Sequence, residues 1–213
     1  ASAHSITHEY ILKKDDYMVD LNVKLNGANQ LLTQGTMNLT WQYAAVQQES
    51  DISYERQNTQ VSYVKDGSFD YHTVGRKSSK NFDETVKWLG IRQRFFFTIL
   101  VAKNGFNSGS MEWTLPADTV VRSVANMKLQ VPAGSPSVVP FSIYYGPSEY
   151  HILRKYDMKF DKAVNLGQGM YAFVRPINRF IIIPIFDFLK GIAGSMGLAI
   201  ALQSSTAVTL LVG

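Results

Sequence analysis

The stretch VSYVKDGSFDY, residues 61–71, decides the fold class of this chain. Two short runs of β-branched and aromatic residues, which favour sheets, lie on either side of Asp66-Gly67. An Asp-Gly pair tolerates the two positive φ angles that a type I′ turn requires between antiparallel strands. The stretch therefore predicts a β-hairpin.

The same pattern recurs on both sides of this hairpin. Residues 18–25 alternate polar and apolar side chains, as a half-buried strand does, and run into Asn26-Gly27, which predicts a second hairpin turn. Further strands are predicted at residues 37–46, 94–102, 111–115, 120–131 and 138–145. Many short strands without a convincing amphipathic helix between them predict an antiparallel sandwich. Ser148 is then the predicted N-cap of a short helix over residues 149–156.

The composition of the 213 residues excludes several classes of function. The chain has no cysteine, which rules out disulfides and thiolate metal sites. Its net charge of +4 is too small to indicate a nucleic-acid-binding protein by charge. Hydrophobic residues make up 46% of the chain, which is enough for a globular core. One all-β domain of this size is therefore expected.

No pattern in the sequence indicates a catalytic or metal site. His4 and His8 have the spacing of a helical metal pair, but their neighbours predict a strand, which separates the two rings. Ser195 lies in a near match to the G-x-S-x-G nucleophile elbow, which belongs to an α/β sheet that this pattern does not predict. The small residues around Ser195 suit packing on a membrane helix instead. We therefore predict no catalytic residue, no metal site and no cofactor.

The segment FIIIPIFDFLK, residues 180–190, changes the character of the chain. Pro184 predicts a kinked or two-part helix, which is too short to cross a hydrocarbon layer of ~30 Å. An aromatic helix with basic residues at its edges is typical of the membrane interface. The residues predicted to lie at that interface are Arg175, Arg179, Ile182, Ile185, Phe186, Leu189 and Lys190. The alternative is a buried core helix that closes the sandwich.

An uncharged apolar stretch follows, over residues 192–213. Its length suits a membrane span, although the polar residues 203–206 interrupt it. We therefore predict three parts: a β-sandwich over residues 1–170, an interfacial amphipathic helix over 171–191, and the start of a membrane span over 192–213.

Basic residues gather between residues 76 and 103, interleaved with aromatic side chains. An exposed face of this kind binds anionic lipid headgroups or a partner protein, and the alternative is the solvated face of a long hairpin. The residues predicted to make lipid or partner contact are Arg76, Lys77, Lys80, Arg92 and Arg94.

Four stretches of the chain have a recognisable pattern, among them WLGIRQRFF at residues 88–96 and YYGP at residues 144–147. The first resembles the W-x-G-x-x-Q-(K/R)-(Y/F)-F stretch of YidC-type membrane protein insertases, and the second is similar to that family's x-(W/Y)-x-G-P strand end. Residues 179–190 are similar to the amphipathic helix that links the family's large periplasmic domain to its first conserved membrane span. Residues 6–23 resemble a strand pair of that domain, with Leu-Lys-(K/R)-x-Asp-Tyr near its centre.

The resemblance implies a mainly β fold, an antiparallel β-supersandwich related to sugar mutarotases, with C-terminal amphipathic and apolar helices. It implies a bacterial inner-membrane protein with its β-domain in the periplasm. The implied function is that of part of an insertase and chaperone, not an enzyme, that inserts and folds inner-membrane proteins alone or with the Sec translocon. The implied partners are the lipid bilayer, nascent membrane proteins and Sec translocon components, with no nucleic acid and no cofactor. The resemblance also implies that this chain lacks the family's N-terminal anchor, the early part of the periplasmic domain and the later membrane spans.

Two other functions are open on the residues themselves. A membrane-tethered carbohydrate-binding or mutarotase-like module needs an acid and a base at a sugar pocket, for which the sequence offers His72 and His151 with several carboxylates. A lipid-binding β protein with a C-terminal helix would need no membrane-protein clients.

Overall fold

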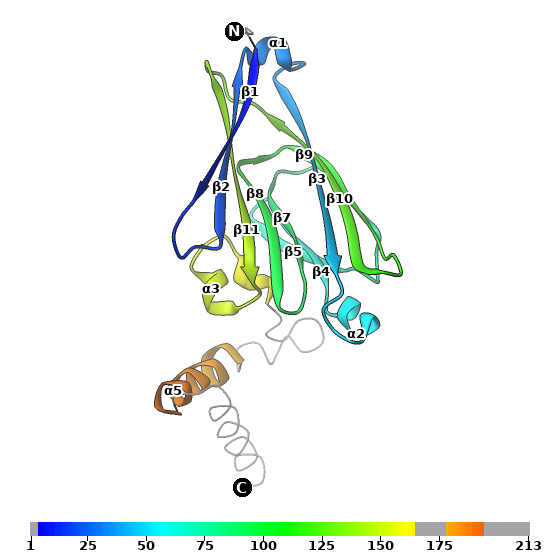
Figure 1. The fold of residues 1–213 in the computed structure, drawn as a ribbon, viewed down its shortest axis with the longest axis vertical. Coiled ribbons are helices and arrows are strands. Elements are labelled where there is room, and N and C mark those ends of the chain that lie inside the picture. The colour runs from blue at the N-terminus through cyan, green and yellow to red at the C-terminus, as the bar shows by residue number, and fades with distance from the viewer. Residues whose placement is uncertain (1–3, 165–177, 194–213) are drawn as a thin grey trace. The chain divides into compact units, whose positions relative to one another are not determined.

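The computed structural model describes residues 4–164 and 178–193 of the chain. The chain divides into two compact units, Ala1–Ala163 and Val164–Gly213. The first unit holds two antiparallel sheets, and the described part of the second holds a helix (Figure 1).

The larger sheet has seven strands and the smaller sheet four. In spatial order, the strands of the larger sheet are β1 (Ser5–Leu12), β2 (Met18–Asn26), β11 (Ser137–Pro147), β8 (Phe96–Phe106), β7 (Val86–Arg92), β4 (Gln60–Lys65) and β5 (Ser68–Thr73). Those of the smaller sheet are β3 (Thr36–Val46), β10 (Thr119–Gln130), β9 (Ser108–Thr114) and β6 (Ser79–Phe82). The helices are α1 (Ala28–Leu31), α2 (Ile52–Gln57), α3 (Tyr150–Arg154), the 3-10 helix η1 (Phe160–Ala163), the π-helix η3 (Asn178–Ile182) and α5 (Ile183–Ala193).

The hairpin at residues 61–71 is confirmed. Strands β4 and β5 pair antiparallel with Lys65 opposite Ser68, and the turn residues Asp66 and Gly67 have φ values of 45° and 70°. Both values are positive, as a type I′ turn requires.

The second predicted hairpin turn, at Asn26-Gly27, is wrong. Gly27 does adopt a positive φ of 72°, but it begins the short helix α1, and β3 lies in the other sheet. Strand β2 pairs with β1 and β11 instead. Gly27 therefore starts the connection from the larger sheet to the smaller one. The sequence correctly indicated a positive φ at this glycine, but it did not indicate that the next strand joins the other sheet.

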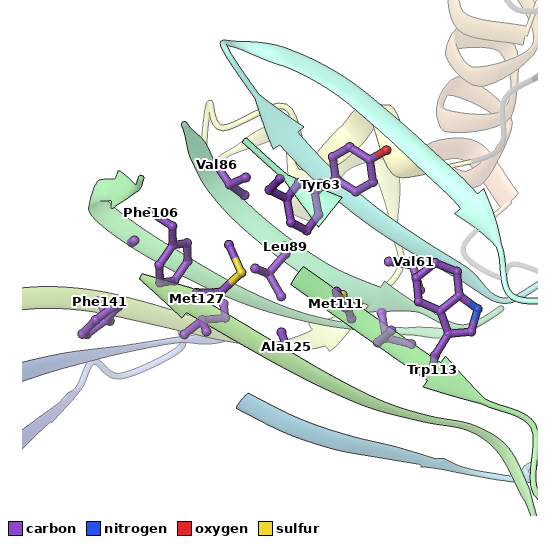
Figure 2. Packing of buried hydrophobic residues seen from close by; sticks show 14 of the residues in the cluster. Val61, Tyr63, Val86, Leu89, Phe106, Met111, Trp113, Ala125, Met127 and Phe141 are labelled. Carbon is purple, nitrogen blue, oxygen red and sulfur yellow. The ribbon is translucent and has the colours of Figure 1, made fainter. Parts of the chain in front are cut away.

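The core lies between the two sheets, which confirms the predicted antiparallel sandwich. Alternation is clearest on β10, where Ala125, Met127 and Leu129 are buried and the residues between them are more exposed. Figure 2 shows Ala125 and Met127 facing Leu89 of the larger sheet. Aromatic side chains complete the packing, among them Tyr63, Phe82, Phe106, Trp113 and Phe141.

A second buried region lies on the outer face of the larger sheet. Trp88, Phe97 and Tyr144 are fully buried there and pack against Phe160 of η1 and one another. The segment from α3 to η1 therefore covers this part of the sheet. We refer to Trp88, Phe97, Tyr144, Tyr156 and Phe160 as the aromatic cluster.

Candidate functional site

Residues 88–96, the WLGIRQRFF stretch, make contacts that connect separate elements at one end of the sandwich. The indole Nε1–H of Trp88 donates a hydrogen bond of 2.7 Å to the carbonyl of Met158, and its ring centroid lies 5.2 Å from that of Phe160. Trp88 therefore fixes the segment after α3 against strand β7.

Gly90 is required by close packing between neighbouring strands. A Cβ atom at Gly90 would lie 2.6 Å from the carbonyl oxygen of Thr98 and 2.9 Å from the ring of Phe97. Real Cβ atoms do not approach backbone oxygens this closely, so a side chain here would push β7 away from β8.

Gln93 connects elements from both sheets. Its amide nitrogen donates to the carboxylate of Glu55 at 3.2 Å, and its amide oxygen accepts from the hydroxyl of Tyr43 at 3.3 Å. Glu55 is buried on α2 and also accepts the backbone N–H groups of Gln48 and Glu49. Because each buried polar group has partners, this network fixes α2 and β3 against the turn after β7.

The YYGP stretch ends β11 in the same region. The hydroxyl of Tyr144 donates to the carbonyl of Pro147 at 2.8 Å, and burial raises the pKa of this tyrosine. A Cβ at Gly146 would lie 2.8 Å from the ring of Tyr17. The buried residues of the two motifs, such as Trp88 and Tyr144, therefore belong to one packed structure, whereas Phe95, Phe96 and Tyr145 are about half exposed.

The helix predicted after this strand is α3, but its predicted cap is wrong. The carboxylate of Glu149 accepts the backbone N–H groups of His151 and Ile152, each at 3.1 Å. Ser148 donates its own backbone N–H to the carbonyl of Phe95. The helix therefore begins at Tyr150, because the chain at Ser148 is still bound to the neighbouring turn.

The five basic residues predicted to make lipid or partner contact are carried by different parts of the sandwich. Arg76 and Lys77 are exposed after β5, whereas Lys80 lies on β6 of the smaller sheet, 6.0 Å from the ring centroids of Tyr63 and Phe82. Arg94 is exposed after β7 of the larger sheet and forms an ion pair of 3.0 Å with Glu49. The sequence placed these residues close together, but the strands that carry them belong to different sheets.

Arg92 was predicted to lie on the contact surface, and for this residue the prediction is wrong. Only 6% of the residue is exposed, and its guanidinium donates to the backbone carbonyl of Asn58 at 3.1 Å. Burial lowers its pKa to about 10. A side chain enclosed in this way does not contribute to an exposed basic face.

Of the two histidines considered for an acid–base site, His72 has the surroundings that resemble such a site more. Its Nε2 lies 3.0 Å from the hydroxyl of Tyr63, which also donates to Asp70 at 3.0 Å. The ring of His72 stacks on Trp113 at 6.4 Å, and burial and then Lys77 lower its pKa. His151 lies exposed on α3 and is not part of this group. The imidazole is engaged by protein groups on several sides, which does not resemble an open sugar pocket.

His8 lies on strand β1, as its neighbours predicted, and His4 comes directly before that strand. Within residues 4–164 and 178–193, no three His, Asp or Glu side chains are arranged to hold a metal ion.

The C-terminal helix has the two-part form that Pro184 predicts. The π-helix η3 ends at Ile182, and α5 begins at Ile183 with Pro184 in its first turn, where a missing N–H costs least. Phe180 and Phe188 are 71% and 68% exposed, and the guanidinium of Arg179 lies 5.6 Å from the ring centroid of Phe180.

Phe180 and Phe188 were not among the predicted interface residues, and the apolar residues that were predicted are less exposed than these two. Ile182, Ile185, Phe186 and Leu189 are all of intermediate exposure. Arg175, the side chain of Lys190 and the Ser195 stretch lie outside the described residues, as does nearly all of residues 192–213. No helix in the described part of the chain has both the length and the apolar character to cross a membrane.

These features define a class of protein: an antiparallel β-sandwich domain that contains two packed sequence motifs and is followed along the chain by a short, apolar, basic-edged helix. The family model of the YidC periplasmic domain matches residues 1–181. The chain therefore belongs to the YidC periplasmic domain family.

Curated relatives agree with this assignment. The chain is 29% identical over 213 residues to the membrane protein insertase YidC of Cytophaga hutchinsonii, covering 92% of this chain and 34% of the relative. It is 26% identical over 208 residues to that of Parabacteroides distasonis, covering 92% and 32%. It is 24% identical over 204 residues to that of Chlorobaculum parvum, covering 93% and 34%. The chain thus spans about a third of the length of these relatives.

Proposed function

We propose that this chain is the periplasmic part of a membrane protein insertase that inserts and folds inner-membrane proteins. The observation that carries the proposal is the match of residues 1–181 to the periplasmic domain family, whose curated relatives are named insertases. In this proposal the sandwich lies in the periplasm and its clients are nascent membrane proteins, handled alone or beside the Sec translocon. The domain acts by binding and positioning and catalyses no reaction.

The test is depletion of the whole gene product in its own bacterium. Newly made membrane proteins should then accumulate in a form that external protease cannot cut at the loops normally exported to the periplasm. Restoring the gene should restore cleavage. Unchanged insertion after complete depletion would contradict the proposed function.

We further propose that the helix formed by η3 and α5 lies in the membrane interface. Its large exposed apolar side chains, Phe180, Ile181 and Phe188, support this position because water-exposed aromatic surface gains free energy at a lipid boundary. Arg179 begins the same segment and can reach headgroups, each basic residue contributing about 1 kcal/mol near an anionic surface. The domain division at residues 170 and 191, and a membrane span after it, are part of the same proposal.

Binding to anionic liposomes tests this position. Changing Phe180 and Phe188 together to Asp should abolish most binding by the helix segment, and changing Ile185 and Phe186 to Asp should weaken it as well. Asp187→Asn is the matched control on the same helix and should not weaken binding. A helix whose binding survives both double substitutions is a core helix, which would overturn the proposal.

A further inference from the structure

Three polar side chains form a hydrogen-bonded group on the inner face of the larger sheet, where strands β4 and β5 pair. Tyr63 pairs with Asp70, and Val61 pairs with His72, so all of these side chains point toward the smaller sheet. The hydroxyl of Tyr63 donates to Asp70 at 3.0 Å and lies 3.0 Å from Nε2 of His72. We refer to Tyr63, Asp70 and His72 as the His72 group.

Trp113 of β9 connects this group to the smaller sheet. Its ring stacks on the ring of His72, with centroids 6.4 Å apart and planes 20° from parallel. Its indole N–H donates at 3.1 Å to the carbonyl of Val74, directly after β5. Trp113 is only 2% exposed and belongs, like Tyr63, to the core between the sheets (Figure 2). These contacts are made by inward side chains, which another strand paired with the backbone of β5 would leave in place.

The hydrogen bonds of the group fix which nitrogen of His72 carries the hydrogen. Burial raises the pKa of Tyr63, so its phenol stays protonated at neutral pH and has one hydrogen to donate. An ionised carboxylate only accepts, so this hydrogen goes to Asp70. The phenol oxygen then accepts from His72, whose Nε2 therefore carries the hydrogen. Nδ1 is left as the nitrogen that takes up a proton in acid.

A proton on Nδ1 of His72 is unfavourable in these surroundings. The charged groups around the His72 group are Lys77 after β5, Lys80 on β6, Lys65 on β4 and Glu84, together with Asp70 itself. Lys65 and Glu84 form an ion pair of 3.3 Å with each other, which leaves two lysines against one carboxylate. Burial, followed by Lys77, accordingly lowers the pKa of His72 from its ordinary value of 6.5.

The direction of this pKa shift gives the direction of the change in stability. The unfolded chain binds the proton more readily than the folded chain. The free energy of unfolding is therefore largest while His72 is neutral, and it falls as the pH drops below about 6.5. A charged imidazole needs water, and it reaches water by turning out of its stack with Trp113. Acid therefore weakens the contact between the end of β5 and β9.

We propose that His72 is a pH-sensitive switch for the packing of β5 against the smaller sheet. In mildly acidic solution, a proton on Nδ1 turns the ring away from Trp113 and loosens the end of β5, and neutral solution restores the contact. The switch is independent of the proposed insertase function. It makes one end of the sandwich responsive to acid, while the aromatic cluster, which contains no histidine, stays closed.

Histidine NMR of the 213-residue chain in lipid nanodiscs measures the state of the ring directly. The chain has only four histidines, so isotope labelling of this residue type gives signals that single substitutions assign. In neutral solution, His72 should carry its hydrogen on Nε2, and its titration midpoint should lie below 6.5. Lys77→Gln should move the midpoint upward, because Lys77 disfavours the charged ring. Lys155→Gln, at the end of α3, is the control and should leave it unchanged.

Hydrogen exchange shows whether the protonated ring loosens β5. Protection factors should be compared in neutral solution and at a pH at which NMR shows the ring to be charged. Those of the amides of β5 and of Val74, which donates to Thr59, should fall at least ~3-fold in the parent chain, and those of β10 should not. His72→Gln should abolish the fall, because its amide can donate to Tyr63 and carries no charge at either pH. His151→Gln removes a histidine of α3 and should respond to acid as the parent chain does.

Three results would overturn the proposal. A loss of protection in acid that survives His72→Gln would assign the response to another group. Unchanged protection of β5 while His72 is charged would show that the charged ring stays in place. A midpoint at or above 6.5, or a hydrogen on Nδ1 of the neutral ring, would contradict the hydrogen bonds and charges described around Tyr63. Where circular dichroism shows that His72→Gln does not fold, Lys77→Gln decides, because the loss of protection in β5 must then begin at a higher pH than in the parent chain.

Discussion

Two regions of the larger sheet, called here the closed side and the open side, differ in how well other elements cover them. On the closed side, where β7, β8 and β11 lie under α3 and η1, the aromatic cluster is packed and the sequence motifs occur. On the open side, formed by β1 at the edge of the sheet, Ile6 and Tyr10 are largely exposed, and this strand belongs to residues 6–23, which also resemble the family. The comparison shows that motif residues such as Trp88 and Gly90 are tightly packed, whereas Ile6 and Tyr10 of β1 add little to the packing between the sheets.

The largest expected effect on stability comes from removing a buried ring from the aromatic cluster on the closed side. Trp88→Ala should lower the free energy of unfolding by about 3–5 kcal/mol, because it removes a fully buried ring and the bond to Met158. Trp88→Phe should cost less, because it keeps much of the packing and loses the indole donor. Urea denaturation measures both. A loss below about 1 kcal/mol for the alanine variant would show that the aromatic cluster is not tightly packed.

Adding a methyl group at a tightly packed glycine on the same side should have the next largest effect on stability. Gly90→Ala should destabilise the fold by about 1–3 kcal/mol, since the new methyl group meets the backbone of Thr98. Gly75→Ala is the matched control, because nothing among the described residues lies within 4 Å of a Cβ placed there. If the two variants unfold at the same urea concentration, the strands can separate without cost.

The open side is stabilised differently, by a charged group on the outer face of β2. Asp20 accepts from the hydroxyl of Ser142 at 2.6 Å and forms ion pairs with Lys103 and Lys13 at 3.0 and 3.1 Å. The Ser142 bond, followed by the two lysines, lowers the pKa of Asp20 from 3.8 to about 2. Because the folded pKa lies below the unfolded one, this stabilisation is present above about pH 4 and is lost as the pH falls through about 2.

Asp20→Asn should therefore cost about 1–2 kcal/mol at pH 7, a value reduced from the full pKa shift because both lysines are substantially exposed. The difference between parent and variant should shrink between pH 4 and pH 2. Asp118→Asn, at an exposed turn position, serves as the control. A difference that stays constant with pH would mean that the ionised carboxylate does not stabilise the fold.

The smallest effect on stability is expected on the open side, at the exposed Tyr10 of β1. Tyr10→Ser should change the free energy of unfolding by no more than about 0.5 kcal/mol, because the side chain is already largely exposed. A loss similar to that of Trp88→Ala would show that the open side is a packed core, and the contrast between the two sides would disappear.

Local sequence patterns predicted those features that depend on neighbouring residues. The turn at Asp66-Gly67 and the two-part helix around Pro184 follow from backbone preferences. The structure has both, with the change from π-helix to α-helix between Ile182 and Ile183. The helix α2 was not predicted, although Asp51 accepts the N–H groups of Ser53 and Tyr54 and could have been identified as its N-cap.

Features that depend on distant strands could not be predicted in this way. The burial of Arg92 follows from the elements packed around β7, and the separation of Lys80 from Arg94 follows from the sheet that each strand joins. Ile6 of β1 and Leu39 of β3 line the same pocket although their strands belong to different sheets, and no local periodicity predicts this. The motif residues were found from the sequence, but their structural role became evident only from contacts such as Trp88 with Met158.

The most direct test of the account compares the two sides in one urea denaturation series, with Trp88→Ala and Tyr10→Ser. The account predicts that the first variant loses about 3–5 kcal/mol of the free energy of unfolding and the second no more than about 0.5 kcal/mol. Equal losses would contradict the claim that the packed motif residues, and not the exposed side chains of β1, maintain the sandwich.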